Sequence, residues 1–201
     1  LCLAKNNDGH RNLMQAISSA HNNYTYQTPI INFKDLKNFK DNIVVVSGGK
    51  DSHIFELSKQ NKINEIEKKI DDFLTVFKND FFIEVQKTNR SDEIDFFSNI
   101  LPLSNKKGIP LIATNDVLFS SKDDYEIHET KVCINTGKTL NDPNREKPFS
   151  DEQYFKSSDE MQELFKGFEE LIDNTNEVAK KCNVSLHTKG YFLPEYPVPA
   201  E

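Results

Sequence analysis

Short apolar runs alternate along this chain with longer segments in which apolar residues recur at helical spacing. The run at residues 43–46 is entirely β-branched and stops at the Ser-Gly-Gly turn at 47–49, which is typical of a buried strand. Residues 1–5, 81–85 and 110–114 show the same strand pattern. Buried strands that alternate with helices are typical of a parallel sheet or barrel covered by helices, so we predict an α/β fold.

Helical spacing is clearest at residues 61–78, where apolar side chains fall on one face and lysine and glutamate fall on the other. Ser157 and Glu160 form a capping box at the start of another predicted helix. That helix is predicted at residues 159–166, and the remaining helices are predicted at residues 9–20, 91–106, 127–134 and 170–181.

The predicted helix at 91–106 has expected ends and an expected buried face. Ser91 is a favourable cap for its start, and Gly108 is placed to end it. The apolar positions expected to face the core are Ile94, Phe97, Ile100 and Leu101.

Composition favours a soluble globular domain. The 201 residues are 36% hydrophobic and 28% charged, which is enough for one domain with its own core. No apolar run approaches the roughly 20 residues of a membrane helix, and residues 1–7 do not resemble a signal peptide. The net charge of −7 argues against a domain that grips nucleic acid by itself, because such a domain carries a basic face. Cys2, Cys133 and Cys182 lack CxxC spacing, which indicates reduced thiols in a cytoplasmic protein.

The segment at 108–119, GIPLIATNDVLF, contains the clearest candidate for chemistry. Its strand ends at Asn115 and Asp116, and the carboxyl ends of strands are where α/β folds build their sites. A carboxylate in that place can bind a hard cation or activate water. The alternative is an Asx-turn or a helix cap. Leu118 stands two residues further on, where a metal site would use a histidine.

Two other polar positions allow both a functional and a structural interpretation. Glu84 lies within an apolar strand, so it must face a polar cavity, a partner charge or solvent, and Gln86 shares its face. His128 follows acidic residues at a predicted helix start, as either a ligand or a hydrogen-bonding anchor. The chain has no HxH or HExxH spacing, no GxSxG nucleophile motif and no Gly-rich phosphate loop.

Seven segments, taken together and in order, resemble one protein family. They resemble the PHP domain of the bacterial replicative DNA polymerase III alpha subunit, a C-family polymerase, in its proteobacterial form. The segments are LAKNNDGHRNLMQAISSA (3–20), VVVSGGK (44–50), FFIEVQKTNRSDE (81–93), GIPLIATNDVLF (108–119), DYEIHETKVCINTGKTLNDPNR (124–145), SDEMQELFKGFEELIDNTNEVAKKCNV (158–184) and YFLPEYPVP (191–199).

This resemblance implies a fold and a parent activity. The expected fold is an incomplete, distorted (βα)7 PHP-type barrel whose first strands would precede Leu1. Residues 1–190 would form the partial PHP domain, and residues 191–201 would link it to the polymerase palm. The parent protein is expected to be a cytoplasmic DNA-directed DNA polymerase of chromosome replication that uses Mg²⁺ in its palm.

The resemblance also implies that the metal site of the PHP family is degenerate here. Metal-binding members have a cysteine where this chain has Gly49, and histidines where it has Thr88 and Leu118. Gly and Leu supply no side-chain donor, so Asp116 alone would remain as a ligand. We therefore expect this segment to bind no cofactor and to have no activity of its own, with Glu84, Asp116 and His128 left as polar cleft residues.

The implied role is a scaffold and docking platform for the proofreading exonuclease subunit. Other polymerase III holoenzyme subunits are also expected partners, DNA would be contacted through the rest of the parent chain, and no membrane is involved. One alternative is an active metal-dependent PHP phosphoesterase or 3′–5′ exonuclease, which predicts His or Cys at positions 49, 88 and 118. Another is a standalone α/β binding module, which leaves the segment at 191–199 unexplained.

Overall fold

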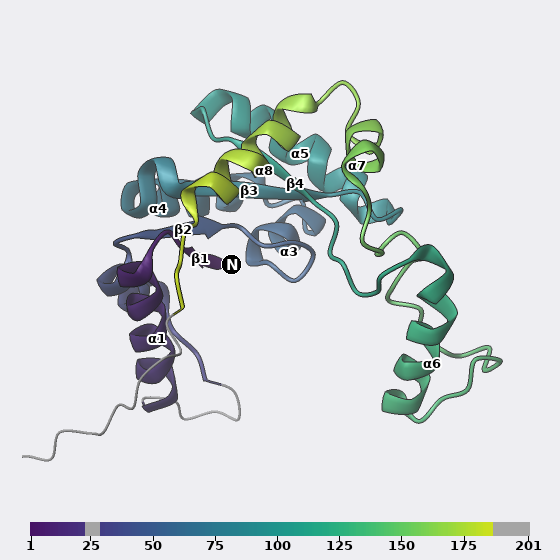
Figure 1. Ribbon diagram of the computed structural model, residues 1–201. Helices are drawn as coiled ribbons and strands as arrows, with labels where there is room; N and C mark the ends of the chain where they lie inside the picture. The colour runs from purple at the N-terminus through teal and green to yellow at the C-terminus, as the bar shows by residue number, and fades with distance from the viewer. Residues whose placement is uncertain (23–28, 187–201) are drawn as a thin grey trace, which may run out of the picture.

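The computed structural model describes residues 1–22 and 29–186, and its centre is a four-stranded sheet covered by helices (Figure 1). Helices α1 and α6 project from the two ends of the sheet, which gives the molecule the outline of an arch. The predicted linker at 191–201 lies outside the described residues. In chain order the elements are β1 (Cys2–Ala4), α1 (Asn7–Asn22), α2 (Phe33–Leu36), β2 (Ile43–Val46), α3 (His53–Lys59), α4 (Ile63–Phe77), β3 (Phe81–Gln86), α5 (Ser91–Lys107), β4 (Leu111–Thr114), α6 (Tyr125–Thr136), α7 (Ser158–Leu164) and α8 (Glu169–Lys181), with short 3₁₀ turns at Lys37–Phe39, Lys78–Asp80 and Lys122–Asp124.

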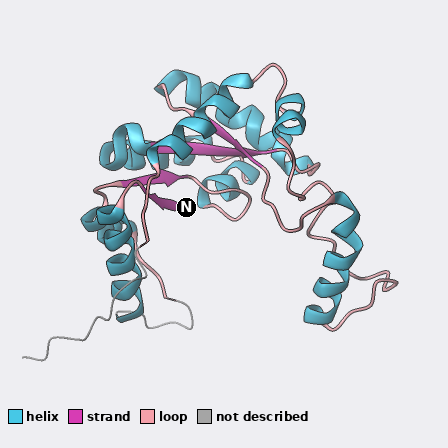
Figure 2. Ribbon diagram, in the orientation of Figure 1, coloured by secondary structure: helices cyan, strands magenta, loops and turns pink. Residues whose placement is uncertain are grey.

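The sheet is mixed, in the order β1-β2-β3-β4 (Figure 2). Strands β2, β3 and β4 are parallel, which confirms the predicted α/β class. Strand β1 runs antiparallel to β2, with Leu3 opposite Val44, so the expectation of an all-parallel sheet is wrong at this edge. A single antiparallel edge strand is common on parallel sheets. In the described part of the chain the strands form one sheet, and closure into a barrel stays a prediction.

The two faces of the sheet bury different sets of side chains. Ile83 and Val85 face the larger core, where residues of α3, α4 and α5 pack. Val44 and Phe82 face the opposite side, where Val178 of α8 covers them. Because side chains alternate along a strand, Glu84 shares the face of Phe82 and lies further towards the carboxyl end of β3.

Helix α8 covers the outer edge of β4 with polar side chains. The Ala113 amide donates to Thr175 Oγ1 at 3.0 Å, and the Thr175 hydroxyl lies 3.0 Å from the Ala113 carbonyl oxygen. Asn174 Nδ2 donates to the Leu111 carbonyl oxygen at 2.9 Å. These bonds satisfy strand groups that an exposed edge would leave open to another chain.

Helix α5 begins and packs differently from the expectation. Arg90, and not Ser91, is its N-cap residue, while Gly108 ends it in the left-handed conformation as predicted. Ile94 is 71% exposed, so its expected burial is wrong. The buried face of α5 consists of three apolar residues, Phe96, Ile100 and Leu103, and two polar residues, Glu93 and Ser104. A prediction that counts only apolar residues therefore assigns the wrong side of α5 to the core.

Two helices were not predicted. The Ser52 hydroxyl caps α3 by accepting the Phe55 amide at 3.2 Å, and Asn32 caps the four-residue helix α2. Both helices are too short to show a repeating apolar pattern. Among the helices that the structure describes, none is both long and apolar enough to cross a membrane.

Candidate functional site

A polar cleft opens at the carboxyl ends of β2, β3 and β4, where the sequence predicted a site. Its volume is about 360 Å³. Glu84 and Gln86 reach it from β3, and Asp116 reaches it from the turn after β4. The turn after β2 supplies most of the remaining wall, so that the lining consists of Leu1, Ser47, Gly48, Gly49, Lys50, Asp51, Ser52, Glu84, Gln86 and Asp116.

The buried side chains of Glu84 and Gln86 form a hydrogen-bond network with Thr114 at this cleft. Gln86 Nε2 donates to Glu84 Oε1 at 3.0 Å and lies 3.3 Å from Thr114 Oγ1. The Thr114 hydroxyl donates to the same Glu84 oxygen at 2.5 Å. The Glu84 amide donates to Ser47 Oγ at 3.0 Å, which ties β3 to the turn after β2. Glu84 therefore faces a polar cavity, and its carboxylate is already hydrogen-bonded within the protein.

Gly49 is packed against the side chain of Gln86. A Cβ at position 49 would lie 2.5 Å from both Gln86 Nε2 and Gln86 Oε1, which is closer than real Cβ contacts come. Gln86 cannot withdraw without losing its bonds to Glu84 and Thr114. The space that a larger side chain at position 49 would need is therefore occupied.

Asp116 holds the turn after β4 instead of pointing free into the cleft. Its backbone is left-handed, with φ 44°, a conformation that Asp adopts more readily than most residues. Asp116 Oδ2 accepts a hydrogen bond from Gln153 Nε2 at 2.7 Å, and Gln153 is fully buried. The neighbouring Asn115 donates to the carbonyl oxygens of Glu152 and Tyr154 at 3.0 and 2.7 Å. Together the two side chains fasten the segment before α7 to the end of β4.

Known proteins that are similar to this chain indicate its family. Residues 1–88 match the model of the PHP domain family. DNA polymerase III subunit alpha of Pseudomonas aeruginosa is 37% identical over 198 residues, which is 98% of this chain. The subunits of the same name from Escherichia coli K12 and Haemophilus influenzae are 35% and 34% identical over 97% of the chain. Residues 1–88 belong to the PHP domain family, and nearly the whole chain is similar to DNA polymerase III alpha subunits. It spans 17% of the length of these curated relatives.

The four positions predicted as a degenerate PHP metal site do not all meet in the cleft. Gly49 and Asp116 line it, whereas Thr88 and Leu118 do not. Leu118 is 40% exposed, and its amide donates to the Gln153 carbonyl oxygen at 2.8 Å. The structure brings only Gly49 and Asp116 of these four positions together at the cleft, and their assignment to a degenerate metal site stays a prediction.

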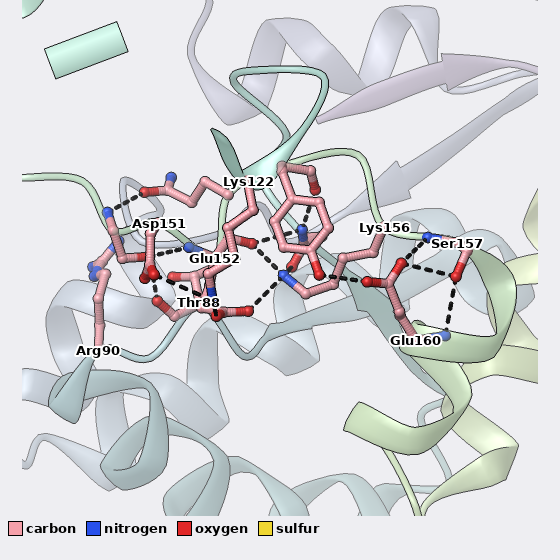
Figure 3. Close-up of polar contacts among 12 residues, drawn as sticks. Thr88, Arg90, Lys122, Asp151, Glu152, Lys156, Ser157 and Glu160 are labelled. Carbon is pink, nitrogen blue, oxygen red and sulfur yellow. Dashed lines mark hydrogen bonds and ion pairs between the residues drawn. The ribbon is translucent and has the colours of Figure 1, made fainter. Parts of the chain in front are cut away.

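Thr88 is fully buried beside the start of α5 (Figure 3). Its amide donates to Glu93 Oε2 and its hydroxyl donates to Glu93 Oε1, both at 2.6 Å. The Thr88 carbonyl oxygen accepts the Ser150 hydroxyl at 2.5 Å. Thr88 thus has a structural role, in which it joins the end of β3, the start of α5 and the loop before α7.

His128 lies on α6, outside the residues that line the cleft. Its ring packs against Phe119 and Phe149, with centroid distances of 5.4 and 4.9 Å. Its Nδ1 is enclosed and has no hydrogen-bond partner in the described part of the protein. The expected hydrogen-bonding anchor is therefore not made through Nδ1, and the ring contacts of His128 are with Phe119 and Phe149.

The cleft of this PHP domain offers few groups for a cation. Within residues 1–22 and 29–186, no three His, Cys, Asp or Glu side chains are grouped so that they could hold a metal ion. The carboxylates of Glu84 and Asp116 each accept hydrogen bonds from neighbouring side chains. That the segment binds no cofactor stays a prediction.

A charged network that was not predicted from the sequence joins Lys122, Asp151, Glu152 and Lys156 (Figure 3). Lys122 pairs with Glu152 at 2.5 Å and with Asp151 at 3.2 Å, and Lys156 pairs with Glu152 at 3.0 Å. Lys122 and Glu152 are 30 positions apart and lie outside any repeating pattern, so no sequence signal joins them.

The capping box at α7 was found from the sequence, and the structure confirms it. Glu160 accepts from the amide and hydroxyl of Ser157 at 2.7 and 2.8 Å, and from the Tyr154 hydroxyl at 2.6 Å. The Tyr154 hydroxyl, followed by Ser157, lowers the pKa of Glu160 to about 2.

Proposed function

We propose that this chain is the PHP-domain segment of a DNA polymerase III alpha subunit, and that the segment is a catalytically degenerate scaffold that docks the proofreading exonuclease subunit. Support for the parent comes from alpha subunits that are 34–37% identical over 97–98% of the chain. The parent would carry out DNA-directed DNA synthesis in the cytoplasm, with Mg²⁺ in its palm, among the other holoenzyme subunits. The four-stranded sheet would be one arc of the PHP barrel, and residues 191–201 would lead to the palm.

The observation that carries the scaffold role is the packing of Gln86 over Gly49. A metal-binding cleft needs side-chain donors that are free to turn towards a cation. Here the side chain of Gln86 fills the space at position 49 and binds Glu84. Asp116 is likewise held by Gln153. The polar groups at the cleft stabilise the ends of the strands, which is what a scaffold requires.

We expect the purified protein to show no metal-dependent nuclease activity. The measurement is removal of nucleotides from a labelled single-stranded DNA 3′ end with Mn²⁺ or Zn²⁺ added, for the natural protein and for Asp116→Ala. The two should give the same background, because Asp116 is committed to Gln153. Metal-dependent cleavage that disappears in Asp116→Ala would instead support the active phosphoesterase or exonuclease alternative.

The docking role predicts direct binding between the complete alpha subunit and the proofreading exonuclease subunit. Both proteins would be purified separately and combined, and the complex would be detected by size-exclusion chromatography. An alpha subunit that lacks residues 1–186 should lose most of this binding. Equal binding by the shortened subunit would place the docking surface elsewhere and would contradict the proposal.

A further inference from the structure

A second and larger groove, which shares Gln86 with the polar cleft, lies between α5 and the segment that joins α7 to α8. Its volume is about 850 Å³. The first half of α5 forms one wall, and Leu164 and Phe168 form the other. The charged and apolar side chains of its lining include Lys87, Arg90, Ile94, Phe97, Leu164 and Phe168.

The walls of this groove present apolar surface to solvent. Ile94 is 71% exposed although it lies within a well-formed helix. Phe97 and Phe168 meet edge to face with their ring centroids 4.9 Å apart, and both are half-buried. Exposed aliphatic and aromatic side chains gathered in one groove are typical of a protein-interaction site.

The groove also contains a cation that has no acidic partner among the described residues. Lys87 Nζ donates to the Leu164 carbonyl oxygen at 2.9 Å and lies 4.8 and 5.6 Å from the ring centroids of Phe165 and Phe168. In the described part of the chain, no carboxylate forms an ion pair with Lys87, and burial lowers the pKa of its amino group. Arg90, which also lines the groove, is paired with Asp92 at 3.2 Å.

The acidic side chains that line the groove are already engaged. Both Glu93 oxygens accept hydrogen bonds from Thr88, and Glu93 is only 4% exposed. Glu152 is paired with Lys122 and Lys156. The positive charge of Lys87 is therefore not balanced locally, in a chain whose net charge is −7.

We propose that this groove docks an extended segment of a partner protein, which places an acidic side chain at Lys87 and apolar side chains against Ile94, Phe97 and Phe168. This inference rests on the proposed docking function and names its surface. A nucleic acid is a poorer occupant, because binding a phosphate backbone needs several unpaired cations and the described lining of this groove supplies one. A peptide segment satisfies both features, since it can carry an acidic group and apolar groups within a few residues.

The test measures the affinity of the complete alpha subunit for the purified exonuclease subunit by biolayer interferometry. Ile94→Asp puts a charge into the apolar wall and should weaken binding by about ten-fold or more. The matched control is Ile134→Asp on α6, since Ile134 is 77% exposed and does not line the groove. This control should change the affinity by less than about two-fold, as expected for an exposed position outside the interface.

A second variant tests the charge. Lys87→Met keeps the unbranched apolar stem of the side chain and removes its charged end, so it should weaken binding several-fold at low salt and flatten the salt dependence. Unchanged affinity in Ile94→Asp, or an equal loss of affinity in Ile134→Asp, would show that this groove is not the docking surface, while the docking function itself would stand. Absence of binding by the natural subunit would overturn the docking function and, with it, this proposal.

Discussion

Replacement of Gly9 by alanine is expected to destabilise the protein by about 3 kcal/mol, the upper end of what overpacking of a close-packed contact costs. Gly9 lies in the first turn of α1 and is buried. An added Cβ would overlap the backbone carbonyl oxygen of Asn42 and would lie 2.9 Å from its carbonyl carbon. The Asn42 oxygen also accepts the Lys5 amide at 2.9 Å, so it cannot move away without loss of the bond that joins β1 to the turn before β2.

The direction of the stability change distinguishes a tight contact at Gly9 from a relaxed one. Alanine is favoured over glycine in a helix by about 0.5–1 kcal/mol, so a relaxed contact would make the variant more stable. Urea unfolding followed by circular dichroism measures the difference. Gly137→Ala is the control, because its Cβ meets no atom within 4 Å and only the left-handed backbone, φ 68°, opposes it. That control should cost about 1–2 kcal/mol, and a smaller loss in Gly9→Ala than in the control would refute the contact.

The regular elements were the predictable part of this fold. The prediction for β2 agrees at both ends because four β-branched residues stand between polar turns. The long helix α4 was found because its apolar residues repeat over four turns. In both places one local signal, either β-branching or periodicity, agrees with the tertiary packing.

The helix faces were less predictable where polar residues are buried. The sequence shows Glu93 as one more charged residue of an amphipathic helix, whereas in the structure it is 4% exposed. A buried carboxylate is stable only when its hydrogen-bond partners are in place, and those partners belong to the loop after β3. The polar character of a side chain therefore could not indicate its burial.

The candidate site was predictable as a location but not as a set of contacts. That β2, β3 and β4 would end at a common polar edge follows from parallel strand geometry, and Gly49, Glu84 and Asp116 do line one cleft. The orientation of Thr88 does not follow, because it depends on the competition between the cleft and the carboxylate of Glu93. Gln153 was missed because a single buried amide in a loop has no pattern around it.

Glu93→Ala is expected to lower the free energy of unfolding by about 3 kcal/mol, since hydrogen bonds to a charged group contribute about 1.5–3 kcal/mol and buried donors left unpaired add to the loss. The variant removes the acceptor of the Thr88 amide and hydroxyl, both at 2.6 Å, in a site that water does not reach. It also removes a negative charge from the first turn of α5, where the helix dipole favours one. The measurement is again urea unfolding, with Glu93→Gln as the isosteric variant. In Glu93→Gln one carboxylate oxygen is replaced by an NH₂ group, which is a donor and would face a donor of Thr88. Part of the loss in the free energy of unfolding should therefore persist although the side-chain volume is unchanged.

Glu160 provides the matched control, because it occupies the same position of a capping box at the start of α7. It accepts three hydrogen bonds, from Ser157 and Tyr154, but these groups are exposed and water can replace the carboxylate. Glu160→Ala should therefore cost much less than Glu93→Ala. Equal losses in the two variants would show that the cap and the helix dipole, and not burial, set the effect.

A coupling between Thr88→Val and Glu93→Gln near zero in a double-mutant cycle would show that the two side chains do not stabilise each other. If burial is the cause, the cycle should instead show a coupling of about 1–2 kcal/mol, because contacting partners in one network do not add independently.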